Sequence, residues 1–325
     1  MPTHDSLTSF ATLPPAPIPW LWPGRLPVAQ ISLLVSRPGV AKSLLTTDLA
    51  ARISTGSPWP DGSTCPQGSV ILISLEDDPA QVIRPRLLAH NADLSKIHIL
   101  TTLHDLAKCT TTPDLFFNIE RYAPLEDALS ILPDCKLVIF DPIAAFFPGS
   151  DIRHDPIIRK SLSTLFHLAQ RYGPAILLVH HLRNRDRGYA DQRILGGSAF
   201  TSISRNIWHL MRDPEQKSRR LFLSGKSNFA PESPALAFTI TNTDPSPNAP
   251  TDSIAAAVGL QDTPRIVWDP QSIPLTADEA LATLPRLPTG PPPLERRSAE
   301  TWLKTLLQPG PCPPTKSASN PKTPA

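Results

Sequence analysis

The stretch ISLLVSRPGVAKSLLTTDLAARI, residues 31–53, indicates the fold class most directly. It starts with a nearly uninterrupted apolar run from Ile31 to Val35, turns at a proline and a glycine, and continues in a helical pattern from Ser43 to Ile53. Short apolar runs of this kind are typical of strands that are buried on both faces, as in a parallel sheet. The stretch therefore predicts a buried strand, a tight turn and a helix in succession.

The same alternation continues along the chain. Three more apolar runs lie at Val70–Leu75, Leu137–Phe140 and Ala175–Val179, and helical patterns over 79–90 and 157–172 lie among them. Alternating buried strands and helices are typical of an α/β domain with a mainly parallel sheet flanked by helices.

After the fourth run the pattern changes. Strand-like segments at Ile207–Met211, Leu221–Ser224 and Leu236–Ile240 predict an antiparallel extension of the sheet, and Arg265–Trp268 predicts one further strand. These segments are short and are bounded by turn residues, which is typical of antiparallel strands.

Proline, which occurs 40 times in 325 residues, marks the ends of the folded part. Residues 1–19 are rich in serine, threonine and proline and predict a flexible lead. Residues 20–270 are expected to form one domain. Residues 271–325 are expected to form a proline-rich tail with one short helix at Leu294–Leu307.

Composition excludes several classes of protein. A net charge of +2 gives no bulk attraction to nucleic acid, so any such binding needs a local basic patch. The chain shows neither a secretory signal pattern nor an apolar run of about 18 residues, so we expect a cytoplasmic protein without a membrane partner. No pair of the cysteines has C-x-x-C spacing, so we expect reduced thiols. The cysteines are Cys65, Cys109, Cys135 and Cys312.

The turn SRPGVAKS, residues 36–43, has the layout of a phosphate-binding loop, or P-loop. In such a loop main-chain N–H groups and a helix N-terminus hold phosphates, a lysine reaches their oxygens, and a serine ligates Mg²⁺. Ser36 and Ala41 replace the two glycines of the usual pattern, and an alanine forced to positive φ costs about 1–2 kcal/mol. The candidate binding residues are Pro38, Gly39, Val40, Ala41, Lys42 and Ser43.

Acidic residues follow two of the buried runs. Asp141 ends LVIFD and Glu76 begins the cluster EDD, so both are expected at the sheet edge that carries Lys42. Asp141 there can hold Mg²⁺, and Glu76 can orient or deprotonate an attacking water. The alternative is a local role, in which Asp77 or Asp78 caps the next helix.

Two histidines and a basic loop follow the fourth run. His180 and His181 end it at the same edge and are candidates to contact a γ-phosphate, although a histidine on a strand is often only a satisfied polar residue. The next loop carries arginines that suit phosphate contacts with nucleic acid, namely Arg183, Arg185, Arg187 and Arg193. Asp186 and Asp191 are interspersed, so a solvated loop is the alternative.

Eight segments stand in the order that they have in the RecA-type AAA-family ATPases of plasmids, phages and other mobile elements, a family that includes RepA-type hexameric replicative helicases. The likeness runs from about residue 20 to 240. The segments are WLWPGRLP, SRPGVAKS, TGSPWPDG, VILISLEDD followed by IRPRL, LVIFDP, LLVHHLRNRD, LGGSAF and SGKSNFAP.

This resemblance implies a RecA-like P-loop NTPase core that binds ATP and Mg²⁺. It implies that Lys42 and Ser43 meet the phosphates and the metal, that Asp141 is the Walker B acid and that Glu76 is the catalytic carboxylate. His180 and His181 fall at the position that senses the γ-phosphate.

The resemblance also implies partners: single-stranded DNA, and further copies of the chain in a ring, expected to be a hexamer. A neighbouring subunit would supply a basic finger, for which Lys226 matches the family's lysine. Asn228 stands where the helicases carry arginine, and Arg205 in the adjoining segment is a substitute. Residues 298–307 resemble the start of a winged-helix-like module that is cut short here.

Two functions remain open at this point. The first is an ATPase that acts on DNA like a helicase, in replication or mobile-element maintenance. The second is a non-catalytic relative that binds DNA or a partner, favoured by Ala41 and Asn228. Recombinase-type and signalling ATPases share the fold, and fold alone does not separate them.

Overall fold

The structure is a computed structural model that describes residues 8–100, 122–147, 155–182, 189–195, 198–242, 262–283 and 293–306. The chain divides into two compact units, Met1–Leu284 and Pro285–Ala325.

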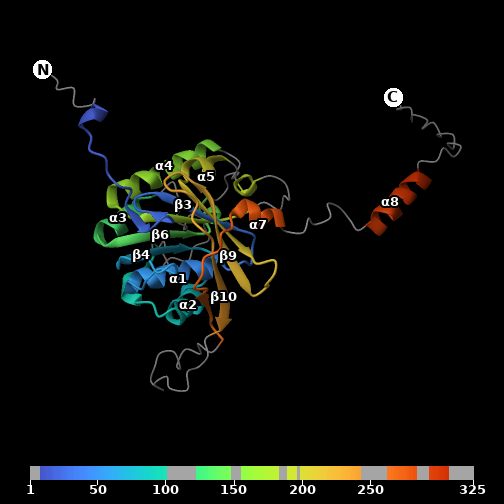
Figure 1. Ribbon diagram of the computed structural model, residues 1–325, viewed down its shortest axis with the longest axis horizontal. Coiled ribbons are helices and arrows are strands. Elements are labelled where there is room, and N and C mark those ends of the chain that lie inside the picture. Colours follow the sequence, from blue (N-terminus) through green and yellow to red (C-terminus); the bar gives the residue numbers. More distant parts are fainter. Residues whose placement is uncertain are drawn as a thin grey trace, which may run out of the picture. The chain divides into compact units, whose positions relative to one another are not determined.

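A nine-stranded sheet in the order β11-β10-β9-β8-β3-β7-β6-β4-β5 forms the centre of the first unit (Figure 1). The strands from β8 to β5 in this order run parallel, whereas β9, β10 and β11 pair antiparallel. This confirms the predicted fold class, a mainly parallel α/β sheet with an antiparallel extension. The strands are β3 (Ile31–Ser36), β4 (Ser69–Ser74), β5 (Ile97–Ile99), β6 (Cys135–Asp141), β7 (Ala175–His181), β8 (Asn206–Arg212), β9 (Arg219–Ser227), β10 (Leu236–Asn242) and β11 (Pro264–Trp268).

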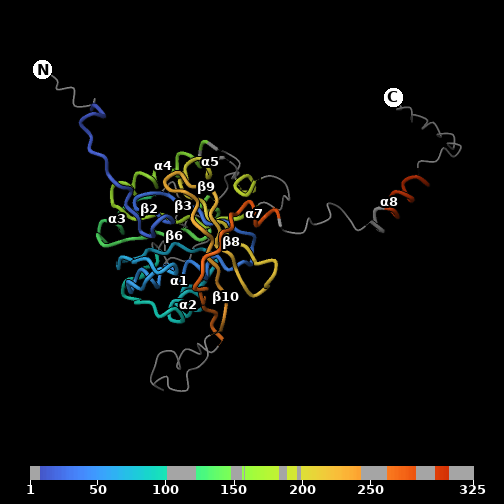
Figure 2. Tube along the Cα trace, viewed as in Figure 1, coloured from blue at the N-terminus to red at the C-terminus, as the bar shows by residue number. Residues whose placement is uncertain are grey.

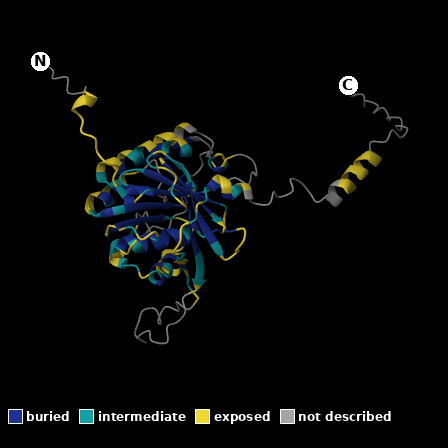
Figure 3. Cartoon of the chain, in the orientation of Figure 1, coloured by how far each residue is buried: buried dark blue, intermediate teal, exposed yellow. Residues whose placement is uncertain are grey.

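Helices cover both faces of the sheet, which is why the central strands are mostly apolar. Every residue of β3 is buried, and side chains of β3 contribute to two apolar clusters, one on each face. One cluster contains residues of α1 and α2, and the other contains residues of α3, α4 and α5. Figure 1 shows these two groups of helices on opposite faces of the sheet, and Figure 3 shows that the strands between them are buried. The helices are α1 (Lys42–Thr55), α2 (Arg84–Ala89), α3 (Ala123–Ile131), α4 (Asp155–Tyr172) and α5 (Ser198–Ile203).

Segments far apart in the chain meet at β3. Its neighbours are β7 on one side and β8 on the other, both of which follow it by more than a hundred residues, as the colours along the trace in Figure 2 show. Because connections between parallel strands must cross over the sheet, the carboxyl ends of all these strands come to one edge.

The aromatic segment before β3 forms a small hairpin of β1 (Trp20–Trp22) and β2 (Leu26–Pro27). Trp22 is fully buried and stacks on Trp59 with ring centroids 4.6 Å apart. The Arg25 guanidinium lies 5.1 Å from the Trp208 ring centroid and donates a hydrogen bond to Asp61. Aromatic packing and the Arg25 guanidinium therefore hold the hairpin of residues 20–27 against the sheet.

The first unit continues past the boundary predicted at residue 270. Helix α7 (Ala277–Thr283) packs against β9 and buries Ala277 and Ala280. Helix α8 (Pro293–Leu306) belongs to the second unit, and its residues 297–306 are exposed (Figure 3). Across the described ranges, no helix combines the length and the apolar character needed to cross a lipid bilayer.

Candidate functional site

Four parallel strands end within about two residues of one another at the carboxyl edge of the sheet. Ser36 of β3 pairs in register with His181 of β7, and Ser74 of β4 with Asp141 of β6. Helix α1 starts at Lys42, a few residues beyond the end of β3. Ligands of open α/β sheets bind at this edge, so the loops that follow these strands are positioned to form a site.

The phosphate-binding loop, residues 36–43, contains two left-handed residues. Gly39 has φ 71°, and Ala41 has φ 79° and ψ 36° at the N-cap of α1. Glycine adopts this conformation without a steric penalty, whereas the β-carbon of Ala41 costs about 1–2 kcal/mol. The conformation expected from the family pattern is thus present despite the alanine.

The side chain of Lys42 points back toward the first residue of the phosphate-binding loop. Its Nζ donates to Ser36 Oγ at 3.0 Å and lies 3.2 Å from His181 Nδ1. The side chain is 7% exposed, and this burial lowers its pKa, while the charges of Asp141 and Glu76 act in the opposite direction. The ammonium is therefore held by groups that a bound anion can replace.

Asp141 is buried beside the start of α1. Burial raises the pKa of its carboxyl to about 6, although the Ser43 hydroxyl and the Lys42 charge act to lower it. Its Oδ2 accepts a hydrogen bond from Thr46 at 3.4 Å. A buried carboxylate next to a serine hydroxyl offers the hard oxygen ligands that Mg²⁺ prefers.

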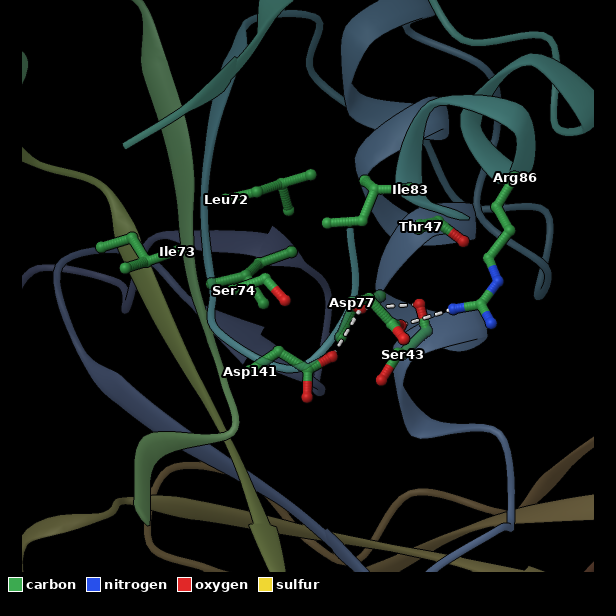
Figure 4. Close-up of a pocket in the computed structure, with 11 residues that line it drawn as sticks. Ser43, Thr47, Leu72, Ile73, Ser74, Asp77, Ile83, Arg86 and Asp141 are labelled. Carbon is green, nitrogen blue, oxygen red and sulfur yellow. Dashed lines mark hydrogen bonds and ion pairs between the residues drawn. The ribbon is translucent and has the colours of Figure 1, made fainter. Parts of the chain in front are cut away.

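The three acidic residues after β4 have different surroundings. Glu76 is exposed and lines the cleft described below. Asp77 also lines it and forms an ion pair of 2.7 Å with Arg86 (Figure 4). Asp78 accepts hydrogen bonds from the main chain of residues 80 and 81 at 2.9 and 2.7 Å, so the capping role is confirmed for Asp78.

A cleft of about 370 Å³ collects these groups. Its polar side combines the phosphate-binding loop with the acidic residues, and its apolar side is formed by residues of β10 and β11. The lining residues are Pro38, Gly39, Ala41, Lys42, Ser43, Leu44, Glu76, Asp77, Arg86, Asp141, His181, Ile240 and Pro264.

The two histidines lie in different environments, because successive residues of a strand point to opposite faces. His181 is half-buried in the cleft beside Lys42, and burial lowers its pKa. His180 is fully buried, with Nε2 2.7 Å from the carbonyl oxygen of Leu195 and its ring 4.5 Å from that of Phe200. His180 does not line the cleft, so only His181 is placed to meet a nucleotide.

His180 is expected to make folding stability depend on pH. Burial lowers its pKa to about 4 from the ordinary 6.5, so the folded protein resists protonation that the unfolded chain accepts. Its contribution is full above pH 6.5 and is lost as pH falls toward 4, by about 3 kcal/mol in total. Denaturant unfolding at pH 7.5 and 4.5 should therefore show a smaller difference in His180→Gln than in the wild type.

His167→Gln, on an exposed position of α4, controls for the loss of an imidazole. An unchanged pH dependence in His180→Gln would contradict the structural role assigned to His180.

The basic candidates lie elsewhere. Arg183, Arg185 and Arg187 fall outside the described residues, and Arg193 is half-buried in a turn of residues 190–193. Lys226 Nζ donates to the main-chain oxygen of Thr201 at 2.7 Å. Because the next residue, Ser227, pairs with the first residue of β8, Lys226 lies toward the sheet edge opposite the cleft.

Several residues of the site were not identified from the sequence. Arg86 and Thr46 contact the acidic groups, and Ile240 and Pro264 line the cleft from strands late in the chain. For Arg86 the sequence offered one indication of a contact with Asp77: it follows Asp77 by nine residues, in the helix predicted next along the chain. Ile240 and Pro264 gave none, because an apolar residue on a strand is usually assigned to the core.

Residues 2–187 match a protein family described as "AAA domain". The matched range includes the phosphate-binding loop, Glu76, Asp141 and His181, and it ends before Lys226. The family match thus covers the polar side of the cleft, whereas Ile240 and Pro264 on its apolar side lie beyond the matched range.

Proposed function

Because the chain belongs to the AAA domain family, whose match covers more than half of it, we propose that it is a Mg²⁺-dependent ATPase of the RecA type that acts on single-stranded DNA. The family match supports nucleotide binding and, in general terms, ATP hydrolysis. The finer proposal is a RepA-like, helicase-like role in replication or mobile-element maintenance, carried out by a homo-oligomeric ring.

One observation supports the ATPase part of the proposal above all. Lys42, Ser43, Glu76, Asp141 and His181 come from four strand ends and line a single cleft. A phosphate-binding loop, a buried acid beside a serine and a second carboxylate are the groups that phosphoryl transfer requires. A chance strand-turn-helix would not bring the other three residues to it.

The residues fit a magnesium ion. Asp141 loses solvation on burial, which a bound cation would offset, and the Ser43 hydroxyl hydrogen-bonds to it. In the described ranges, this site included, no group of three or more His, Cys, Asp or Glu side chains could hold a metal, so the phosphate oxygens would have to complete the ligand set. Ser43 and Asp141 would hold Mg²⁺ together with phosphate oxygens, and the ion would supply neutralisation of developing charge on the phosphates.

The chain's own side chains would then divide the remaining work. Main-chain N–H groups of the loop and the Lys42 ammonium would bind and orient the triphosphate, Lys42 exchanging Ser36 and His181 for phosphate oxygens. Glu76 would take a proton from the attacking water in line with the γ-phosphate. His181 would lose its contact with Lys42 and report the bound state to the loop that follows it.

The proposal for DNA and oligomerisation rests on the family resemblance and on position. Lys226 lies away from its own cleft, as a group that serves a neighbouring subunit must, but its ammonium donates to main-chain carbonyls here. The finger role for Lys226 or Arg205, and DNA contacts by Arg183, Arg185, Arg187 and Arg193, are proposals of this kind.

ATP turnover with and without single-stranded DNA tests the function. We expect Mg²⁺-dependent turnover that DNA stimulates, a ring-sized mass by light scattering, and loss of turnover in Lys42→Ala. A Lys42→Ala variant as active as the wild type would remove the proposed site. Turnover that DNA does not change would restrict the function to the ATPase itself.

The backbone conformation of Ala41 favours a second candidate, a relative that has lost tight nucleotide binding and survives as a DNA- or partner-binding module. The two candidates differ in what Ala41→Gly does, because glycine removes a strain of about 1–2 kcal/mol at φ 79°.

If the alanine is accommodated, we expect Ala41→Gly to tighten nucleotide binding by no more than about 30-fold, measured by calorimetry. A decayed site would instead go from no detectable binding to clear binding. Ala29→Gly, another alanine at positive φ but outside the cleft, is the matched control for a general gain in stability.

A further inference from the structure

Arg212 reaches the phosphate-binding loop from a distant part of the chain. Strands β3 and β8 pair in parallel from Ser32 with Asn206 to Val35 with His209, so the last residues of β8 continue beside the loop. The guanidinium Nη2 of Arg212 donates to the main-chain oxygen of Gly39 at 2.9 Å.

This hydrogen bond determines which way the peptide after Gly39 faces. A trans peptide is planar, so its carbonyl oxygen and its N–H point in opposite directions. Gly39 and Ala41 line the cleft and Arg212 does not, so the oxygen is held on the side away from the cleft. The N–H of Val40 is thereby directed toward the side on which an anion would bind.

Fold stability does not explain the arginine. Arg212 is exposed, and it pairs directly across β8 and β9 with Arg220, an arrangement of like charges that is unfavourable. Burial and, after it, the charge of Arg212 lower the pKa of Arg220. Arg212 thus lies opposite another arginine and donates its hydrogen bond to the phosphate-binding loop. We therefore look for its role in the conformation of that loop.

We infer that Arg212 is a positioning residue for phosphate binding, which holds the loop with its N–H donors turned inward and so compensates for the alanine at position 41. The inference rests on the proposed nucleotide binding. The strain at Ala41 favours relaxation of the loop, and the charged hydrogen bond at Gly39 opposes it from the other side of Val40.

A double-mutant cycle tests this coupling, with binding of a non-hydrolysable ATP analogue and Mg²⁺ as the measurement. We expect Arg212→Ala to weaken binding about tenfold, as loss of a hydrogen bond to a charged group does. In the Ala41→Gly background the same change should weaken binding about threefold or less, because glycine holds the loop without strain. Arg212→Lys, which keeps the charge, should stay within about threefold of the wild type.

Lys217→Ala is the matched control, since it removes an exposed cation from the turn between β8 and β9 and should leave affinity unchanged. The melting temperature of Arg212→Ala should not fall below that of the wild type.

Wild-type affinity in Arg212→Ala would overturn the inference while leaving the proposed function intact. An equal loss in both backgrounds, with a lowered melting temperature, would overturn it in favour of a structural role. Absence of binding by the wild-type protein would instead contradict the proposed function and, with it, this inference.

Discussion

Glu76→Gln is expected to lower ATP turnover by a factor of about 10²–10⁴ while leaving nucleotide affinity within about twofold. Glutamine has the same shape but does not accept a proton, so it removes the proposed base and leaves the phosphate-binding loop intact. Glu76 is exposed at the rim of the cleft, so the change should not affect folding. Single-turnover hydrolysis and equilibrium binding, measured on the same preparation, separate the two effects.

Asp78→Asn is the matched control for Glu76→Gln. Asp78 is an acid of the same cluster, but it caps the following helical turn and does not line the cleft. Asparagine also caps helices well, so turnover should stay at the wild-type level. If Glu76→Gln and Asp78→Asn turned over ATP equally fast, Glu76 would not be the base.

Asp141→Asn is expected to reduce Mg²⁺-dependent turnover by about 100-fold or more, because the ion's charge stabilisation is worth several kcal/mol. The buried carboxylate is the anionic ligand that we propose beside Ser43. The pKa of Asp141, raised to about 6 by burial, gives a second signature. Below pH 6 a proton competes with the metal, so the wild type should need more Mg²⁺ for half-maximal turnover as pH falls.

The Mg²⁺ requirement of the Asp141→Asn variant should rise less than that of the wild type from pH 7 to pH 5, since only the terminal phosphate of the nucleotide still titrates there. Asp127→Asn, an exposed acid on α3, controls for the loss of one negative charge. An Mg²⁺ requirement that rises equally below pH 6 in wild type and Asp141→Asn would exclude Asp141 as the metal ligand.

The central strands were predictable from the sequence because burial on both faces makes most of their residues apolar. Strand β3 was expected over 31–35 and is observed over 31–36, and the strand expected over 137–140 is β6, observed over 135–141. Strand β5 was not predicted, since it has only three residues at the sheet edge and its side chains are at most half-buried. Strands at an edge lack the pattern that burial imposes.

The grouping of Lys42, Glu76 and Asp141 was predictable for a topological reason: parallel strands deliver their carboxyl ends to one edge. The roles of His180 and His181 could not be separated, because alternation along a strand does not say which face carries the site. The contact of Arg212 with Gly39 could not be predicted from the sequence either. It joins residues 173 positions apart and depends on the register in which β3 and β8 pair.

Calorimetric titration with magnesium nucleotide tests the central claim most directly, which is that the loop of residues 36–43 binds a triphosphate although it carries Ala41. The wild type should release or take up heat in a saturable, one-site curve, and Lys42→Ala should give only the heat of dilution. No saturable heat from the wild type, or the same curve from Lys42→Ala, would contradict the account.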